Sequence, residues 1–433
     1  MTTLPVSALP RASATLRLLS GYERLFLAID IVNGFNFAIA VTFSGVIAHS
    51  RWQAAFAQLQ KRHPLLNAAV NVDDWHAPAF ERVAGDPIPL TFLRRASATD
   101  WQRVMESEIA EPFNLSVAPL LRAAIVEDDA GCDLVITANH VIADGISVLA
   151  LVAELLRVLA GHTFEVLPLP QSAEARVAAI VASEPGLALD AAVIDEFTPT
   201  PTPRAFTPRN RKGKNTISAL RLSPAQSTLL LERSRQNQTT VSAVLLAALA
   251  FAVRRLSPDQ SGSDLQWSTP VNTRPYLGNE GDLAVSVISA RGIDPHSGDD
   301  LFAAARTVKS NIAKFQNLRA IPATFTRVDA IYAHKLDAAT LVKAVVSNAG
   351  HDLMLSNLKT AEFLVEPDGL TVESVWGPSV LLGIEGEQMI GSVTFGGALH
   401  LLYSSFTPLP GLLAAVSDMI ETACNASERN QRS

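Results

Sequence analysis

The sequence changes character at residues 138–145, which read Ala138-Asn139-His140-Val141-Ile142-Ala143-Asp144-Gly145. Residues 133–138 are nearly continuous in apolar side chains, which predicts a strand buried on both faces. Residues 146–160 carry apolar side chains at helical spacing and precede Gly161, which predicts a helix that ends there. The eight residues therefore turn from a buried strand into a helix, and rigidly supported turns of this kind favour functional side chains.

Three residues of this turn suit chemistry. The imidazole of His140 is able to accept a proton near neutral pH. Asp144 is suited to pair with a distant cation, and Gly145 allows a close approach that a Cβ would forbid. These residues predict a site at the end of the strand.

Structural interpretations of the same residues stay open. His140 fits a core histidine bonded to a backbone carbonyl, and Asp144 fits the N-cap of the following helix. The pair also suits a metal site, but no third ligand stands nearby in the sequence, so we expect no metal. The turn alone does not separate these interpretations from a functional one.

Outward from the turn, the first half alternates predicted strands with predicted helices. Ser20 and Glu23 have the S-x-x-E spacing of a capping box, which predicts a short helix through Leu25 and Leu27. Further helices are predicted at residues 50–62, which Pro64 ends, and at residues 100–110. Strands are predicted at residues 36–43, 65–72 and 120–126.

A stretch rich in proline and basic residues divides the chain nearly in half. It contains Pro199, Pro201, Pro203 and Pro208. Prolines remove amide donors and fix φ, so this stretch is typical of a linker. We therefore expect two domains, residues 1–185 and 216–433, joined by a linker at residues 186–215.

The second half again mixes strands and helices. Strands are predicted at residues 216–222, 265–271 and 284–290, and near residues 353, 371, 380, 393 and 400. Helices are predicted at residues 224–236, 241–256, 300–315 and from about residue 410. Mixed elements in two halves predict an α/β or α+β fold.

Composition excludes several classes of protein. Apolar residues make up 48% of the chain and charged residues 18%, which is typical of a folded protein. The net charge of −7 offers no general attraction for nucleic acid or an anionic membrane. Cys132 and Cys424 are too few for a disulfide framework. The N-terminus lacks a secretory signal, and residues 241–253 are shorter than the roughly 20 that span a bilayer, so we expect a soluble cytoplasmic protein.

Six segments along the chain form a second pattern. They are Ser20–Leu27, Arg62–Leu66, residues 112–122, residues 139–145, Thr269–Pro275 and Ser356–Leu358. In this order they resemble the opening helix and the R-H-P-x-L, P-F-D-L-x-x-x-P-L-x-R, HHxxxDG, P-V-x-x-R-P and S-N-L segments of the condensation-domain and chloramphenicol-acetyltransferase-like superfamily. The resemblance extends over about residues 16 to 405.

The resemblance implies two chloramphenicol-acetyltransferase-like subdomains that form a V with a central active-site tunnel, entered by donor and acceptor from opposite faces. It identifies His140 as the base that takes the proton of an acceptor hydroxyl or amine as that atom attacks a thioester. The Gly145 amide is then a candidate donor to the oxyanion, with Asn357 and Ser356 as further candidates.

Two positions need comment in this pattern. The resemblance implies that Asp144 is structural and paired with Arg274, although Arg274 also fits a surface arginine that ends a strand. The chain departs from HHxxxDG at Asn139, where the family has its first histidine. That position generally supports the loop and is not the base, and alcohol-accepting members tolerate its change. Asn139 therefore weakens a peptide-bond-forming assignment more than an ester-forming one.

The resemblance also implies the donor. It is an acyl chain on the phosphopantetheine of a carrier protein or on CoA, with no tightly bound cofactor. A carrier protein is acidic, so we expect a basic docking patch. The candidates, which also fit a solvated basic loop, are Arg204, Arg209, Arg211, Lys212 and Lys214. No carrier or adenylation segment is attached, so we expect action in trans, as a monomer.

We therefore expect an acyltransferase that moves an acyl group from a thioester to an alcohol. The product would be an ester in secondary-metabolite or lipid biosynthesis. Two alternatives stay open. One is an amide-forming stand-alone condensation enzyme with an amine acceptor. The other is a catalytically silent or repurposed member that docks a carrier protein.

Overall fold

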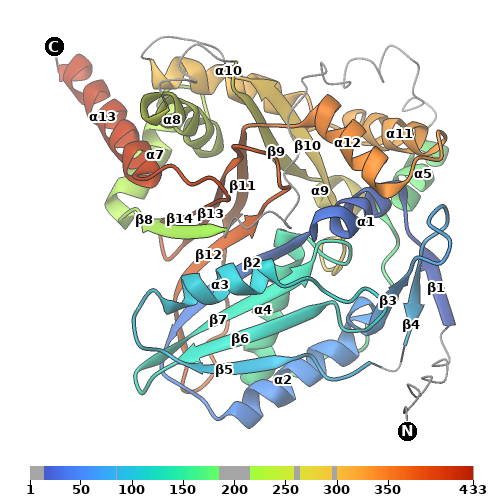
Figure 1. Cartoon of the computed structure of the whole chain (residues 1–433). Coiled ribbons are helices and arrows are strands. Elements are labelled where there is room, and N and C mark those ends of the chain that lie inside the picture. Colours follow the sequence, from blue (N-terminus) through green and yellow to red (C-terminus); the bar gives the residue numbers. More distant parts are fainter. Residues whose placement is uncertain (1–13, 84, 185–214, 258–263, 295–299, 433) are drawn as a thin grey trace, which may run out of the picture.

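The computed structural model describes residues 14–83, 85–184, 215–257, 264–294 and 300–432, with side chains described up to residue 426 (Figure 1). The described residues form three sheets, with strand orders β12-β2-β7-β6-β5, β1-β4-β3 and β10-β9-β11-β13-β14-β8. Helices cover the sheets, which confirms the predicted mixed α/β fold. The predicted linker and its basic residues lie outside the described residues, apart from Asn215, so the division into domains stays a prediction.

The first half holds seven strands and five helices among its described residues. The strands are β1 (Ala14–Leu18), β2 (Asn36–Ser44), β3 (Ala68–Asn71), β4 (Ala79–Arg82), β5 (Leu90–Arg94), β6 (Leu121–Glu127) and β7 (Gly131–Asn139). The helices are α1 (Gly21–Asn33), α2 (His49–Arg62), α3 (Asp100–Ala110), α4 (Gly145–Leu159) and α5 (Ala173–Ser183).

The second half contributes the remaining elements. Its strands are β8 (Thr216–Arg221), β9 (Gln266–Asn272), β10 (Val287–Ile293), β11 (Leu353–Thr360), β12 (Thr371–Val380), β13 (Gln388–Phe395) and β14 (Ala398–Ser405). Its helices are α7 (Pro224–Gln236), α8 (Val241–Leu256), α9 (Arg274–Leu277), α10 (Leu301–Ala313), α11 (Ala320–Tyr332), α12 (Ala338–Ala349) and α13 (Leu412–Arg432).

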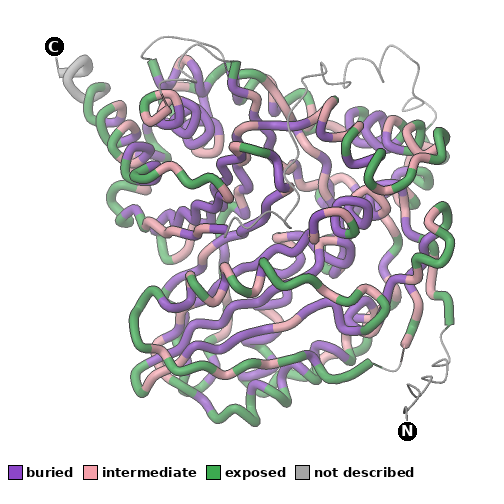
Figure 2. The backbone as a smooth tube through the Cα atoms, viewed as in Figure 1, coloured by how far each residue is buried: buried purple, intermediate pink, exposed green. Residues whose placement is uncertain are grey.

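Strand β7 lies in the middle of the first sheet and carries the turn at its end. It is buried along its whole length, as its apolar sequence predicts, and pairs antiparallel with β2 and β6. The alternation along β2 sends Phe37 and Ile39 into the main core, which includes residues of α2 and α4. Ala38 and Ala40 face α3 instead, where their small side chains let the helix lie close to the sheet. Figure 2 shows this buried layer running through the strands of both halves.

The two halves are interlocked by β12. Its residues come late in the chain, yet the strand pairs antiparallel with β2, with Val375 opposite Val41. The same strand lies beside β13 and β14 of the six-stranded sheet. In Figure 1 it runs from the upper half of the molecule into the lower one. The five-stranded sheet therefore contains a strand from the second half of the chain.

Three local expectations are wrong. Residues 65–72 are not one strand, because Pro64 starts a short 3-10 helix (Pro64–Asn67) before β3 begins at Ala68. The strands expected near residues 371 and 380 are the single strand β12. The sequence also indicated no elements where α11 and α12 form. By contrast, α3, α7 and α8 have the predicted limits, and the capping box of Ser20 and Glu23 is confirmed.

Helix length also bears on membrane insertion. Within the described part of the chain, no single helix has the length and hydropathy to cross a bilayer. Helices α7 and α8 reach the threshold only as a pair, by length and composition, and that pair is bent by 99°.

The interlock predicts that both halves unfold together. Val375 is fully buried on β12, so Val375→Ala removes packing atoms from the strand that joins the sheets. We expect the free energy of unfolding to fall by about 2 kcal/mol, from lost burial and from the cavity left behind. Urea unfolding followed by tryptophan fluorescence and by circular dichroism measures this change, and both signals should move to the same lower midpoint.

Glu373→Ala, on the exposed face of the same strand, is the matched control and should change stability by less than about 0.5 kcal/mol. Trp52 and Trp267 are buried in different halves and report on each. Two separate transitions, with only one of them shifted by Val375→Ala, would contradict the interlock.

Candidate active site

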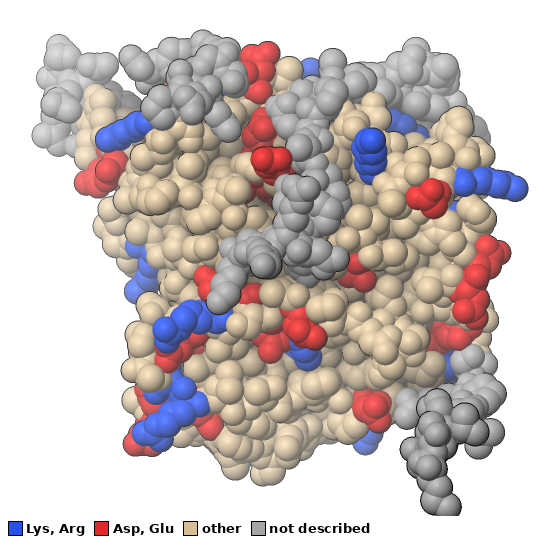
Figure 3. All heavy atoms as spheres, in the orientation of Figure 1, with Lys and Arg blue, Asp and Glu red and all other residues tan. Residues whose placement is uncertain are grey.

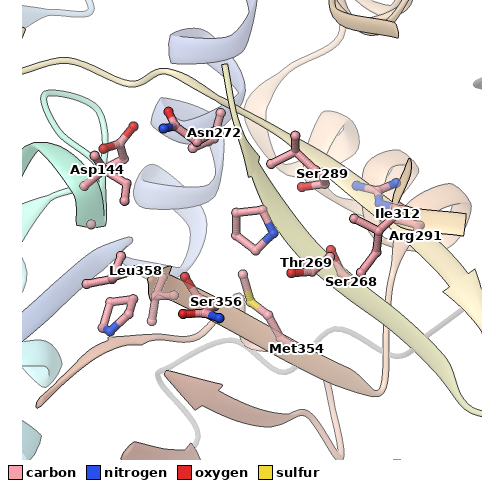
Figure 4. A pocket seen from close by; sticks show the side chains of 18 of the residues that line it. Asp144, Ser268, Thr269, Asn272, Ser289, Arg291, Ile312, Met354, Ser356 and Leu358 are labelled. Carbon is pink, nitrogen blue, oxygen red and sulfur yellow. The ribbon is translucent and has the colours of Figure 1, made fainter. Parts of the chain in front are cut away.

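A cavity of about 490 Å³ lies between the two halves. The first half lines it with α1 and with the turn that joins β7 to α4. The second half lines it with β9, β10, β11 and α10 (Figure 4). Its walls are mainly apolar and carry a few polar groups, which is typical of a site for a small molecule. The cavity therefore brings together segments from most of the chain.

His140 stands at the end of β7 and lines this cavity. Its backbone N–H donates to the carbonyl of Phe35 at 2.8 Å, which fixes the turn to the start of β2. Its ring Nδ1 lies 2.9 Å from the carbonyl oxygen of Ala143. A carbonyl oxygen only accepts, so Nδ1 carries the proton in this hydrogen bond. In the neutral ring the lone pair is then on Nε2, the atom that a base uses.

Three aromatic rings enclose the imidazole of His140. Phe35 stacks on it with ring centroids 4.7 Å apart, and Phe37 lies at 4.6 Å. Phe26 from α1 meets it edge-on at 4.6 Å. These contacts restrict the rotation of the ring, so Nε2 keeps one orientation. The rings shield part of the imidazole from water, and His140 stays partly exposed at the cavity wall.

Shielding from water sets the protonation state of His140. Burial lowers the pKa of His140 from 6.5 to about 4, and the negative charge of Asp144 opposes this shift only in part. The imidazole is therefore neutral at pH 7. A neutral ring with a free Nε2 is a proton acceptor, so the arrangement suits a general base. The two interpretations of His140 are compatible, because Nδ1 is bonded to a backbone carbonyl while the residue also lines the cavity.

Asn139 is fully buried and does not line the cavity. Its Nδ2 donates to Oδ1 of Asp30 at 2.8 Å, and its Oδ1 accepts from the Val141 N–H at 3.0 Å. The same Asp30 oxygen accepts from the Phe35 N–H at 2.6 Å. Asn139 thus ties the turn to the end of α1 and takes no part in the wall that faces a substrate.

Asp144 and Arg274 form an ion pair inside the protein. Nη1 of Arg274 lies 2.9 Å from Oδ2 of Asp144, and both side chains are about 2% exposed. The Ser286 N–H also donates to Oδ2, while Oδ1 accepts from the Ser147 N–H and caps α4. Burial alone would raise the pKa of Asp144, but Arg274 and these donors hold it below its usual range. Asp144 is therefore both an ion-pair partner and an N-cap.

Gly145 begins α4 at the cavity wall. A Cβ at this position would stand 2.8 Å from Cδ2 of Leu358 and 3.5 Å from Pro378, so glycine permits α4 to meet β11 and β12 closely. The first N–H groups of a helix have no acceptor within the helix. The Gly145 N–H is one of these, and Gly145 lines the cavity.

Ser356 and Asn357 reach the same cavity from β11. The amide of Asn357 is already engaged, since its Nδ2 donates to Oγ of Ser242 at 2.7 Å and its Oδ1 accepts from the Lys359 N–H. The structure thus places His140, Asp144, Gly145, Ser356 and Asn357 on one cavity. Arg274 supports it from behind.

Several residues of the site were not recognised in the sequence. They include the aromatic residues Phe26, Phe35 and Phe37, and the polar residues Tyr22, Ser289 and Arg291. Aromatic residues in a predicted helix or strand fit a plain core equally well, so the pattern held no signal for them. Among the described residues, no group of three or more His, Cys, Asp or Glu side chains is placed to hold a metal ion.

The family model for the condensation domain matches residues 30–346. The chain is 26% identical over 284 residues to a protein of the plipastatin synthase from Bacillus subtilis, which is 62% of this chain and 8% of that protein. This chain therefore spans less than a tenth of the length of that relative.

Solved structures show the fold. Polyketide synthase associated protein 5 from Mycobacterium tuberculosis aligns with a TM-score of 0.66 at 17% identity, over 96% of this chain and 100% of that chain. Trichothecene 15-O-acetyltransferase from Fusarium sporotrichioides aligns with a TM-score of 0.63 at 13% identity, over 94% of each chain. The predicted chloramphenicol-acetyltransferase-like fold is confirmed.

The ion pair predicts strong coupling between Asp144 and Arg274. Asp144→Ala leaves the guanidinium buried without its partner, and Arg274→Met does the same to the carboxylate. We expect each change to lower the free energy of unfolding by about 3 to 5 kcal/mol. The double variant should lose less than the sum, because it leaves no unpaired charge. Chemical unfolding of the four proteins measures the coupling.

Asp300→Ala is the matched control for the capping part of this loss. Asp300 caps α10 through the N–H groups of Phe302 and Ala303, and its removal should cost about 1 kcal/mol. If Asp144→Ala costs no more than Asp300→Ala, the ion pair does not stabilise the turn.

The burial of His140 predicts its titration. In the folded protein the ring should take up a proton near pH 4, while the unfolded chain does so near pH 6.5. The unfolded chain then binds the extra proton between these values, so His140 makes the fold less stable as pH falls from about 6.5 to about 4. NMR titration of the imidazole signals measures the midpoint, and His140→Gln identifies the signal. A midpoint near 6.5 would show that the ring is hydrated.

Proposed function

The chain belongs to the condensation-domain family, and we propose that it is an acyltransferase that moves an acyl group from a thioester to an acceptor hydroxyl. The observation that carries this proposal is the placement of the His140 imidazole. Its Nδ1 is anchored on a carbonyl, and its free Nε2 stands at the wall of a cavity between the two halves. This arrangement supports proton removal inside a mainly apolar cavity.

The first step proposed is attack of the acceptor on the thioester. The acceptor oxygen forms a bond to the thioester carbon while its proton passes to Nε2 of His140. A base with a lowered pKa is a weak one in water. The developing negative charge on the adduct stabilises the imidazolium beside it, and this attraction is strong in a cavity with little water.

The second step is loss of the thiolate. The tetrahedral adduct collapses, the carbon–sulfur bond breaks, and the imidazolium of His140 returns its proton to the leaving sulfur. The products are an ester and a free thiol, and His140 is neutral again. The acceptor oxygen is the nucleophile, so no acyl group is bound to the protein at any stage and the reaction needs no nucleophile from the protein.

The adduct also carries an oxyanion, which requires donors that are already in place. We propose the Gly145 N–H for this role, because it opens α4 and the helix N-terminus attracts negative charge. Ser356 on β11 is a second candidate. Asn357 suits the role less, since both ends of its amide have partners. Asp144 and Arg274 act on the reaction only by holding the turn in shape.

Asn139 favours an alcohol as the acceptor only through the resemblance, because alcohol-accepting members of the superfamily tolerate a change at this position. The family pattern has a histidine there, but in this chain the residue is buried against Asp30 and away from the cavity. Its replacement by asparagine removes no base from the site. An amine acceptor, which would give an amide, is the other outcome of the experiment below.

The donor is proposed to be an acyl group on the phosphopantetheine of a carrier protein or on CoA. Over the described residues of the face in Figure 3, Lys and Arg are interspersed with Asp and Glu. That part of this face therefore offers no basic patch of a single sign for an acidic carrier protein. Both donors carry the acyl group on the same thioester, so the proposed steps at His140 are the same for a carrier protein and for CoA.

The test is transfer followed by intact-mass spectrometry. An octanoylated carrier protein and octanoyl-CoA are each offered with octanol, with octylamine or with neither. We expect acyl loss that depends on octanol, and a fall of about 10² to 10⁴-fold for His140→Ala, which is the usual contribution of a general base. His76→Ala, on an exposed histidine outside the cavity, is the matched control.

Three outcomes separate the proposals. Transfer that survives His140→Ala, with circular dichroism showing both proteins folded, would refute the base assignment. Transfer to octylamine alone would replace the ester by an amide. No acyl loss from either donor with either acceptor would favour a member that docks a carrier protein without this chemistry.

A further inference from the structure

The cavity wall contains a cation that the reaction at His140 does not use. Arg291 lies on β10 and lines the cavity together with Ser289. The two residues are two positions apart on one strand, so they share a face of the sheet. Figure 4 shows both beside Ile312, on the opposite side of the view from Asp144. Arg291 is therefore part of a second polar region in the same cavity.

Arg291 is partly buried and has no acidic partner among the described residues. Arg274 pairs with Asp144, Arg62 with Glu154, and Arg254 with Asp294. Arg291 has no such ion pair, and its Nε is buried without a hydrogen-bond partner. A cation held away from water without a counter-charge is costly, and an anion that enters the cavity removes that cost.

Arg327 is a second arginine near Arg291. Burial lowers the pKa of Arg291 to about 10, the phenol of Tyr22 opposes this shift, and the nearby cation Arg327 adds to it. Arg291 is still charged at neutral pH. The carboxylate of Glu174 accepts a hydrogen bond from the backbone N–H of Tyr22 at 2.7 Å, and its charge helps to raise the pKa of the Tyr22 phenol.

Two hydroxyl groups complete the region. Tyr22 comes from α1 and lines the cavity together with Ser289. Burial raises the pKa of Tyr22, so its hydroxyl keeps its proton and is able to donate. A guanidinium beside two hydroxyls matches the two oxygens of a carboxylate. Ile312 and Met354 offer apolar wall for the rest of such a molecule.

We propose that Arg291, with Ser289 and Tyr22, binds a carboxylate carried by one of the two substrates. This inference rests on the proposed function and narrows it to acids, either a dicarboxylic acyl donor or a hydroxy acid acceptor. Arg291 selects the substrate by its charge and takes no part in proton transfer.

The first test is binding, which does not depend on turnover. Isothermal titration calorimetry compares octanoate with octanamide, two probes of equal size of which only octanoate is charged. We expect wild type to bind octanoate at least ten times more tightly than octanamide. Arg291→Gln should remove that preference by weakening octanoate alone. Arg306→Gln, on the exposed side of α10, makes the same charge change outside the cavity and should have no effect.

Equal binding of the two probes to wild type would overturn the proposal, and so would a preference that survives Arg291→Gln. Loss of the carboxylate site in Arg291→Gln is distinguishable from a general loss of structure in that variant. Because Arg291 lacks an acidic partner, Arg291→Gln should melt no earlier than wild type, and octanamide binding should be unchanged.

The second test locates the carboxylate and uses turnover. Succinyl-CoA is compared with pentanoyl-CoA as donor, and 4-hydroxybutyrate with butanol as acceptor, in wild type and in Arg291→Gln. The variant should raise KM for the acid of one pair at least tenfold and leave kcat nearly unchanged. The pair affected identifies the donor or the acceptor. If neither pair responds while turnover is intact, the carboxylate site is refuted and the acyltransferase stands. If octanoate binding depends on Arg291 but no donor is consumed, the acyltransferase fails and the anion site stands.

Discussion

Asp144 and Arg274 are 130 residues apart in the chain and meet at 2.9 Å with almost no contact with water. Taking two charges out of water is costly, and their attraction repays this only when the remaining hydrogen-bond groups are satisfied. Here Oδ1 of Asp144 caps α4, and Oδ2 accepts from both Arg274 and the Ser286 N–H. The pair therefore holds three parts of the structure together: the turn after β7, the start of α4, and the edge of the six-stranded sheet at β9 and β10.

The chemistry proposed for His140 depends on that fixed turn. The carbonyl that orients its ring belongs to Ala143, the residue directly before Asp144. A turn that moved would lose this hydrogen bond and with it the tautomer that leaves Nε2 free. Three phenylalanine rings then pack around the imidazole, and burial lowers its pKa so that the ring is neutral at pH 7. The packing around His140 thus also determines its protonation state.

The cavity lies between two halves that share a strand. Strand β12 belongs to the second half in the chain and to the first half in the sheet, so neither half is complete alone. The first half supplies the proposed base, and the second supplies most of the polar wall, including the region around Arg291. The proposed base at one side, and at the other a cation with no acidic partner in the described part of the chain, define a direction along which a substrate would lie.

The sequence by itself determined many of the local elements and the turn that carries the candidate site, but it gave no sign of α11 and α12. Helices α3, α7 and α8 have their predicted limits because capping residues, prolines and apolar spacing act over a few positions. The turn at His140 was evident for the same reason. Only the tertiary structure decided that β12 crosses between the sheets, that Phe35 and Phe37 enclose the imidazole, and that Arg291 stands without an acidic partner among the described residues. Each of these depends on which distant residues meet, and a pattern of neighbours along the chain holds no information about such meetings.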